Sequence, residues 1–117
     1  MNWVDLAPTI VRQRLIIEGT LHSTMRPEAK STYVEKIGPA LNMISVTAPM
    51  LNYNSDYGWC AYKHWKESGI HMYGWDRHDP PFFSVDIYTC KPFDPITAVD
   101  FTKKFFGRQL KQLTYKE

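Results

Sequence analysis

The stretch FFSVDIYTC, residues 82–90, decides the fold of this chain. Its residues alternate between apolar and polar types, which is typical of a β-strand whose two faces lie in different surroundings. The alternation predicts two sets of side chains on opposite faces, namely Phe83, Val85, Ile87 and Thr89 on one and Ser84, Asp86, Tyr88 and Cys90 on the other. We expect the first set to lie in the core, and the second to place an acid and a thiol on the other face.

A helix is predicted shortly after this strand. Asp94 suits the N-cap position, Pro95 suits the first helical position, and Gly107 suits the end of the helix. Between them, apolar residues at helical spacing form one broad face: Ala98, Val99, Phe101, Phe105 and Phe106. This face is expected to pack against the sheet.

The rest of the chain predicts further strands and one more helix. Residues 11–21 predict a strand, and the residues from Pro27 onward predict a helix that Gly38-Pro39 kinks or shortens. The other predicted elements are a strand at 43–51, a turn at 52–58, strand segments at 59–66 and 70–75 joined or bent around Ser68-Gly69, a loop at 77–81 and an edge strand at 110–115.

With residues 59–75 counted as one bent strand, the predicted order is β-α-β-β-β-α-β. The helices are too few and come too late for a parallel α/β sheet. We therefore expect an α+β fold in which residues 1–117 form a single domain, with an antiparallel sheet and two helices on one face. The other face then needs a cover, which a homodimer pairing sheet to sheet would supply.

Composition argues against several classes of protein. The formal charge of +2 is small and the basic residues are scattered, so no nucleic-acid partner is expected. No apolar run approaches the roughly 18 residues of a membrane span, and the N-terminus lacks the basic and apolar parts of a signal peptide. The two cysteines, Cys60 and Cys90, favour the reducing cytoplasm, and without CxxC or HxxxH spacing no metal site is expected.

Two residues are the main candidates for chemistry. Cys90 lies at the end of a strand just before a helix, although free cysteines often only pack in the core. His71 shares a predicted strand face with Tyr73, and a lone strand histidine is also commonly structural. The aromatic residues that could stack on a planar ligand, or equally lie in the core or an interface, are Tyr53, Trp59, Tyr73 and Trp75.

The segment SVDIYTC at residues 84–90, followed by Asp94-Pro95 and an amphipathic helix, resembles the hallmark of the bacterial-type, pyruvoyl-dependent S-adenosylmethionine decarboxylases. In that family the stretch is roughly small-(V/I)-D-(V/I)-(F/Y)-T-C-G, then D-P and a helix. Upstream, ESGIHMYGWD at residues 67–76 corresponds to the family's E-S-H-x-(S/T)-I-H-(T/S)-aromatic-P-E, and residues 55–58 correspond to its glycine-containing turn. The resemblance covers about residues 14–107.

The resemblance implies a self-cleaving enzyme. Ser68 would become a pyruvoyl cofactor as the chain is cut after Glu67, and the pyruvoyl carbonyl would form a Schiff base with the amine of S-adenosylmethionine and accept electrons as carbon dioxide leaves. His71 would assist the proton transfers of cleavage, and Cys90 would protonate the product carbon. The decarboxylated product would feed spermidine synthesis. Weaker candidates for contact with the substrate are Tyr53, Tyr73 and Trp75.

The chain also departs from the family pattern. Ser68 and His71 are three positions apart, whereas five separate the serine and the histidine of the family. When His71 is aligned without gaps, Lys66 takes the place of the serine. Gly69 and Lys91 replace a histidine and a glycine of the family. The alternatives to a processed decarboxylase are an uncleaved homologue that binds S-adenosylmethionine or regulates a partner, and a different enzyme that degrades S-adenosylmethionine on the same fold.

Overall fold

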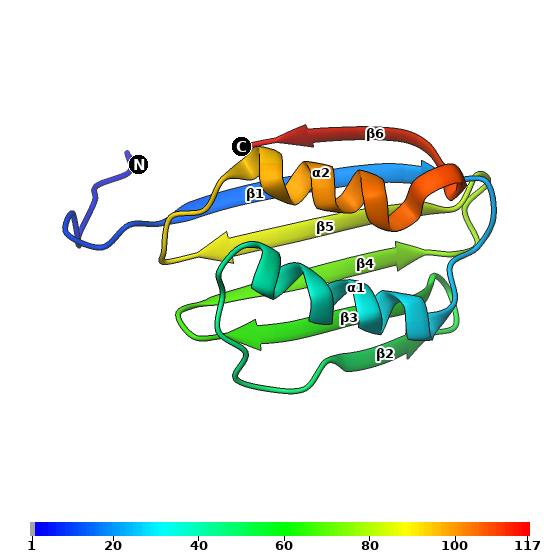
Figure 1. Ribbon diagram of the computed structural model, residues 1–117, viewed down its shortest axis with the longest axis horizontal. Coiled ribbons are helices and arrows are strands. Elements are labelled where there is room, and N and C mark those ends of the chain that lie inside the picture. Colours follow the sequence, from blue (N-terminus) through cyan, green and yellow to red (C-terminus); the bar gives the residue numbers. More distant parts are fainter. Residues whose placement is uncertain (1) are drawn as a thin grey trace.

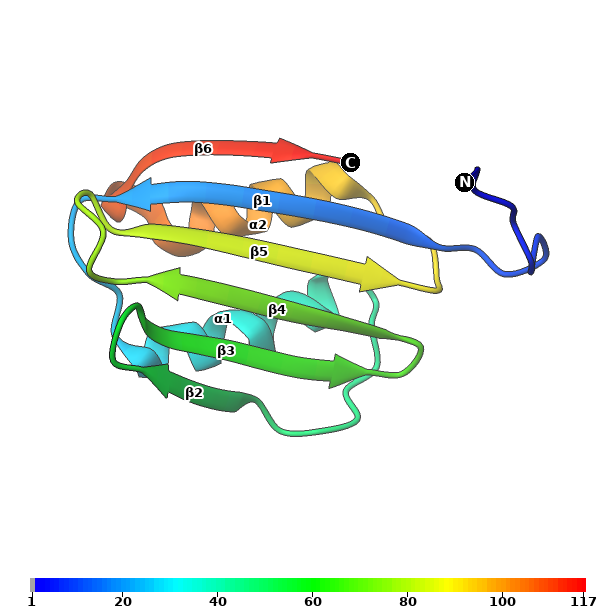
Figure 2. The same ribbon diagram turned by 180° about the vertical axis from the view of Figure 1, so that it is seen from behind.

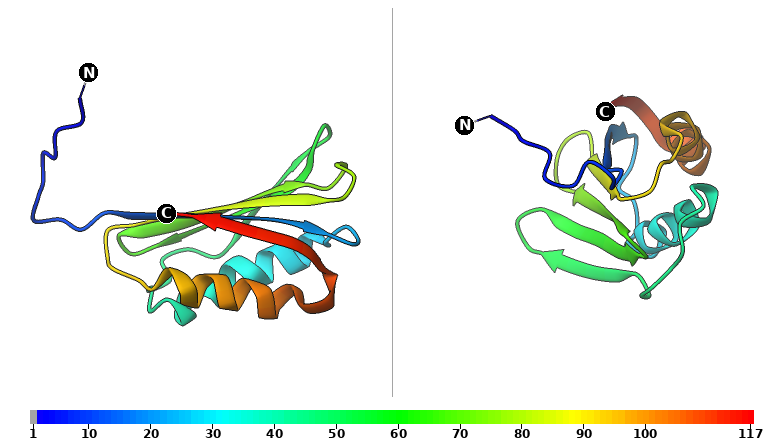
Figure 3. Two further views of the ribbon diagram at one scale, coloured as in Figure 1. Left: turned by 90° about the horizontal axis from the view of Figure 1, so that it is seen from above. Right: turned by 90° about the vertical axis from the view of Figure 1, so that its left-hand side faces the viewer.

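A computed structural model describes residues 2–117, which form a six-stranded antiparallel sheet with both helices on one face (Figure 1). The elements are β1 (Gln13–Leu21), α1 (Pro27–Ala40), β2 (Met50–Asn54), β3 (Gly58–Trp65), β4 (Ser68–Trp75), β5 (Phe82–Thr89), α2 (Pro95–Phe106) and β6 (Leu110–Lys116). Across the sheet the strands follow the order β2-β3-β4-β5-β1-β6. Figure 3 shows the two layers, with the helices side by side below the sheet. The predicted α+β class and the placement of both helices are confirmed.

The alternation predicted for residues 82–90 is confirmed in β5, which lies inside the sheet between β4 and β1. Phe83, Val85, Ile87 and Thr89 are buried beneath the helices. Ser84, Asp86, Tyr88 and Cys90 are half-buried or exposed on the opposite face. The core therefore lies between the sheet and the helices, and the other face of the sheet has no cover within the described chain (Figure 2).

Local sequence sets the limits of both helices. The carboxylate of Asp94 accepts a hydrogen bond from the backbone N–H of Ile96 (3.0 Å), and Gly107 ends α2 with a φ of 55°. Helix α1 includes Pro39 in its last turn and ends one residue later, at Ala40. The helices meet at Tyr33, whose hydroxyl lies 2.8 Å from the hydroxyl of Thr102. This ring also packs against three phenylalanines of α2, namely Phe101, Phe105 and Phe106.

The strand predicted at residues 43–51 is wrong. The segment before Met50 is irregular and makes a single isolated bridge, between Ser45 and Trp65. Pro49 lacks the N–H that a sheet ladder needs, and strand β2 begins only after it. The predicted turn at 52–58 is correspondingly too long, because β2 extends to Asn54.

The two strand segments predicted at 59–66 and 70–75 are present, but the joint predicted at Ser68-Gly69 and the counting of both segments as one strand are wrong. The structure has two strands, β3 and β4, joined by a hairpin turn at Lys66-Glu67, and Trp65 pairs with Ser68 across it. Glu67 adopts a φ of 67°, in a backbone region that residues other than glycine seldom occupy. Ser68-Gly69 therefore belongs to β4, and the order of elements becomes β-α-β-β-β-β-α-β.

A buried lysine fastens α1 to the sheet. The side chain of Lys30 is 1% exposed, and its ammonium group donates to both carboxylate oxygens of Asp76 (2.5 and 2.7 Å) and to the carbonyl of Trp59 (2.8 Å). Asp76 also accepts from the N–H of Trp59 (2.8 Å). A Cβ added at Gly74 would lie 2.5 Å from this ammonium group, so the sequence keeps a glycine beside it. Among residues 2–117, neither helix is long and apolar enough to cross a membrane.

Candidate functional site

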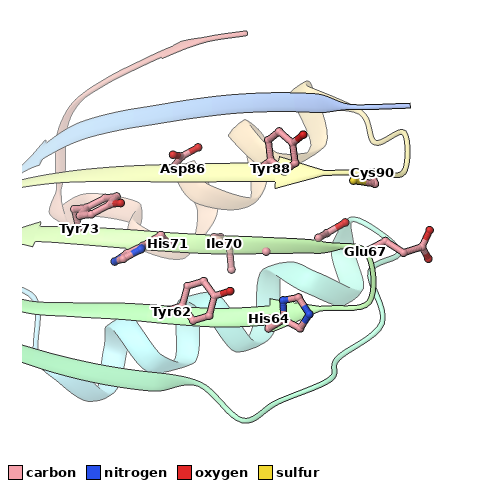
Figure 4. A pocket seen from close by; sticks show the side chains of 11 residues that line it. Tyr62, His64, Glu67, Ile70, His71, Tyr73, Asp86, Tyr88 and Cys90 are labelled. Atoms are coloured by element: carbon pink, nitrogen blue, oxygen red, sulfur yellow. The ribbon is translucent and has the colours of Figure 1, made fainter. Parts of the chain in front are cut away.

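A pocket of about 500 Å³ lies on the uncovered face of the sheet, which we call the open face (Figure 4). Strand register brings its centre together, because Tyr62 of β3 pairs with His71 of β4, and His71 pairs with Asp86 of β5. Residues that pair directly across neighbouring antiparallel strands point to the same face of the sheet. The wall also includes Tyr73, Tyr88, Glu67, His64 and Cys90.

The floor of this pocket is aromatic. The rings of His71 and Tyr73 stack with centroids 3.9 Å apart and planes 7° apart, and Tyr62 meets His71 edge-on at 5.7 Å. Burial lowers the pKa of His71, and the charge of Asp86 opposes part of that shift. The imidazole is therefore neutral at neutral pH and acts as one more aromatic ring in the floor.

An ion pair borders the pocket on its β1 side. Arg14 donates from Nε to Oδ1 of Asp86 (3.0 Å) and from Nη2 to Oδ2 (2.7 Å). This two-pronged geometry is the strong form of an arginine–carboxylate pair. The hydrogen bond to Asp86, together with its charge, raises the pKa of Arg14. Asp86 lines the pocket, and Arg14 lies beside it on β1.

A second pocket of about 520 Å³ continues the first across β3 towards the sheet edge. The two pockets share Tyr62, His71 and Tyr73. The residues that belong only to the second are Met50, Asn52, Asn54, Tyr57, Cys60 and Ala61. The open face therefore holds one long depression with the His71–Tyr73 stack at its middle.

Cys90 and His71 line the same pocket but are separated along it. Cys90 follows β5, four residues beyond Asp86, the residue that pairs with His71. At about 3.3 Å of rise per residue, the two lie on the order of 13 Å apart along the strand direction. The backbone N–H of Cys90 instead donates to the carbonyl of Glu67 (2.9 Å), at the hairpin turn.

Ser68 borders this pocket with its side chain turned the other way. Ser68 points to the same face of β4 as Ile70 and Met72, which are buried beneath the helices. The residues paired with Ser68 on the neighbouring strands, Trp65 and Thr89, are buried as well. The hydroxyl of Ser68 is inaccessible and makes no hydrogen bond with the described residues. In the uncut chain the hydroxyl of Ser68 therefore faces the core side of the sheet, away from His71 and Asp86.

The three weaker candidates are placed differently from one another. Tyr73 lines both pockets. Trp75 shares the face of Tyr73 but lies outside both pockets, where it packs against Tyr57 (centroids 4.4 Å apart). Tyr53 alternates with the pocket residues Asn52 and Asn54, so its ring lies on the other side of β2, near Trp59 (5.1 Å).

The sequence placed Asp86 and Tyr88 on the open face but gave them no role, and it did not single out Tyr62 or Arg14. Tyr62 alternates with the buried Ala61, and Arg14, which borders the pocket, alternates with the buried Leu15. Strand alternation was thus the signal that could have identified them as a group. Their meeting in one pocket required the order and register of four strands.

The protein is thus of the α+β class, with two helices on one face of an antiparallel sheet and an aromatic pocket bordered by an ion pair on the other. The family model for S-adenosylmethionine decarboxylase matches residues 22–116. The chain belongs to this family. No curated protein matches the chain.

Proposed function

We propose that this chain binds S-adenosylmethionine in the pocket of the open face, as an unprocessed member of its family, and does so in the cytoplasm, where its two unpaired cysteines stay reduced. The observation that carries the proposal is the stack of His71 on Tyr73 beside the Arg14–Asp86 pair. Family membership supplies the identity of the ligand, and the floor of the pocket supplies groups that suit it.

The chemistry of S-adenosylmethionine matches these groups. Its sulfonium is a cation with little hydration, and aromatic faces such as those of Tyr62, Tyr73 and Tyr88 attract cations of this kind. A neutral imidazole at His71 avoids repelling the sulfonium. The adenine ring is planar and stacks on aromatic side chains. The volume of about 500 Å³ lies in the range of pockets that hold ligands of this size.

Isothermal titration calorimetry tests the proposal. S-Adenosylmethionine is expected to bind the wild-type chain, and Tyr73→Ala is expected to weaken binding about tenfold, since a desolvated cation–π contact contributes on the order of 1–2 kcal/mol. Tyr115→Ala is the matched control, because Tyr115 lies on the edge strand β6 and outside both pockets. Absence of heat with wild-type protein at millimolar ligand would contradict the proposal.

Pyruvoyl-dependent decarboxylation of S-adenosylmethionine for spermidine synthesis is the second candidate. Family membership favours it, and so does the hydrogen bond from the Cys90 N–H to the carbonyl of Glu67, at the peptide where the resemblance locates cleavage. Denaturing mass spectrometry separates the candidates. An intact chain of 13.7 kDa is expected, whereas two fragments meeting between Glu67 and Ser68, absent in Ser68→Ala, would establish the second.

We further propose that two copies pair through their open faces. Exposed aromatic rings on this face, which single molecules seldom leave bare, support the pairing: Tyr62, Tyr73, Trp75 and Tyr88. Such pairing would also shield both pockets from water. Sedimentation equilibrium at micromolar concentration is expected to give twice the chain mass of 13.7 kDa. The mass of a single chain at that concentration would refute the pairing.

A further inference from the structure

We infer that Arg14 and Asp86 form the subsite for the amino-acid head of the ligand, with its carboxylate on Arg14 and its ammonium group on Asp86. The nucleoside then lies in the second pocket, near Asn52 and Asn54. This inference rests on the proposed function and adds an orientation to it. Arg14 precedes residues 22–116, the part of the chain that the family model matches.

The guanidinium of Arg14 has donors to spare. It carries five N–H donors, and the two bonds to Asp86 use only one edge of the fork. Nη1 donates to no residue within 2–117, and the side chain is 59% exposed. The two bonds to Asp86 orient the guanidinium and leave its other edge open. A ligand carboxylate could therefore bind Arg14 in a second two-pronged pair without breaking the first.

Asp86 has acceptors to spare in the same way. A carboxylate offers about four lone-pair sites, of which Arg14 occupies two. Asp86 also lines the first pocket directly, beside His71 and Tyr88. A ligand ammonium group at this point would meet a negative charge, while the carboxylate one carbon away would meet the positive charge of Arg14. Side by side, the two residues match the opposite charges of an α-amino acid.

With its amino-acid head at this subsite, the rest of the ligand extends along the depression in one direction. From Asp86 the depression crosses His71 and Tyr62 and ends at β2, three strands away, which is about 14 Å at the usual strand spacing. An extended S-adenosylmethionine has a comparable length. Its sulfonium would lie over the aromatic floor, and its adenine would reach Asn52 and Asn54, whose side-chain amides can donate and accept at a base edge.

Three ligands titrated by calorimetry test this orientation. Decarboxylated S-adenosylmethionine lacks the carboxylate, and methylthioadenosine lacks the whole amino-acid head. Arg14→Ala is expected to weaken binding of S-adenosylmethionine about tenfold or more and to leave the other two ligands within about twofold, because the loss concerns a charge-assisted pair. Arg14→Lys keeps the charge and should restore part of the affinity. Arg26→Ala, an exposed arginine far from the pocket, is the control.

Asp86→Asn provides the complementary measurement. It is expected to weaken both ligands that carry the ammonium group and to spare methylthioadenosine. Equal losses for all three ligands in Arg14→Ala, or undiminished binding of S-adenosylmethionine, would overturn the inference even if the variant is folded by circular dichroism. Failure of the wild-type chain to bind any of the three overturns the proposed function instead, so the two failures are distinct.

Discussion

Replacing Asp76 with alanine is expected to lower the free energy of unfolding by about 3–5 kcal/mol, because it leaves the buried ammonium group of Lys30 without its carboxylate partner. The ammonium group of Lys30 donates to both oxygens of Asp76, and Lys30 is 1% exposed. Without the carboxylate, only the carbonyl of Trp59 remains as a partner. A domain of ordinary stability has about 5–15 kcal/mol in total, so this variant approaches the limit of folding.

A double variant separates two contributions to this loss of stability, the unpaired ammonium charge of Lys30 and the lost packing of the Asp76 side chain. Lys30→Met removes the charge and keeps an apolar side chain of similar length, so Lys30→Met with Asp76→Ala is expected to be more stable than Asp76→Ala alone. Asp100→Ala is the matched control, since Asp100 is exposed on α2. Urea unfolding followed by circular dichroism measures all four chains. A loss under about 1 kcal/mol in Asp76→Ala would mean that water reaches Lys30.

Trp65→Ala is expected to cost about 3–5 kcal/mol of stability, as is usual for a large buried aromatic residue. Trp65 is fully buried at the end of β3, just before the hairpin turn. Its ring lies against Gly38 of α1, where an added Cβ would come within 2.8 Å of Nε1. The alanine variant would therefore leave a cavity between the helix and the sheet.

Trp65→Phe is the informative comparison. The Nε1 of Trp65 makes no hydrogen bond with the described residues, so phenylalanine keeps most of the apolar contact and loses no partner. We expect its loss of stability to be less than half that of Trp65→Ala in urea unfolding. Trp3→Ala, at a side chain 86% exposed, should change stability by no more than about 0.5 kcal/mol. Equal losses in Trp65→Ala and Trp65→Phe would show that the indole nitrogen matters after all.

Strand β5 and helix α2 could be predicted because their signals are local. Alternation in residues 82–90 separates the core face from the open face, and Asp94, Pro95 and Gly107 mark the helix ends through their own backbone preferences. Each signal lies within the element that it specifies. Neither depends on which strand comes to lie alongside.

Strand β2 and the position of the turn between β3 and β4 were predicted wrongly because they depend on pairing. The alternation around Ile44 and Val46 imitates a strand, yet both side chains are exposed and their segment makes no ladder. The hairpin turn falls at Lys66-Glu67, and this position decides which face receives Ser68. Since side chains alternate, a shift of one residue in the turn would put Ser68 on the opposite face.

The sequence by itself determined the α+β class, the core face of β5, the ends of α2 and the likeness to the S-adenosylmethionine decarboxylase family, to which the matched residues 22–116 assign the chain. Only the tertiary structure decided that the hydroxyl of Ser68 is buried beneath the helices and that Arg14 meets Asp86, a residue 72 positions further along the chain. The physical reason is the separation in sequence over which each interaction acts. Alternation and capping act within a few residues, whereas a pocket on a sheet is made of neighbours that only strand order and register bring together.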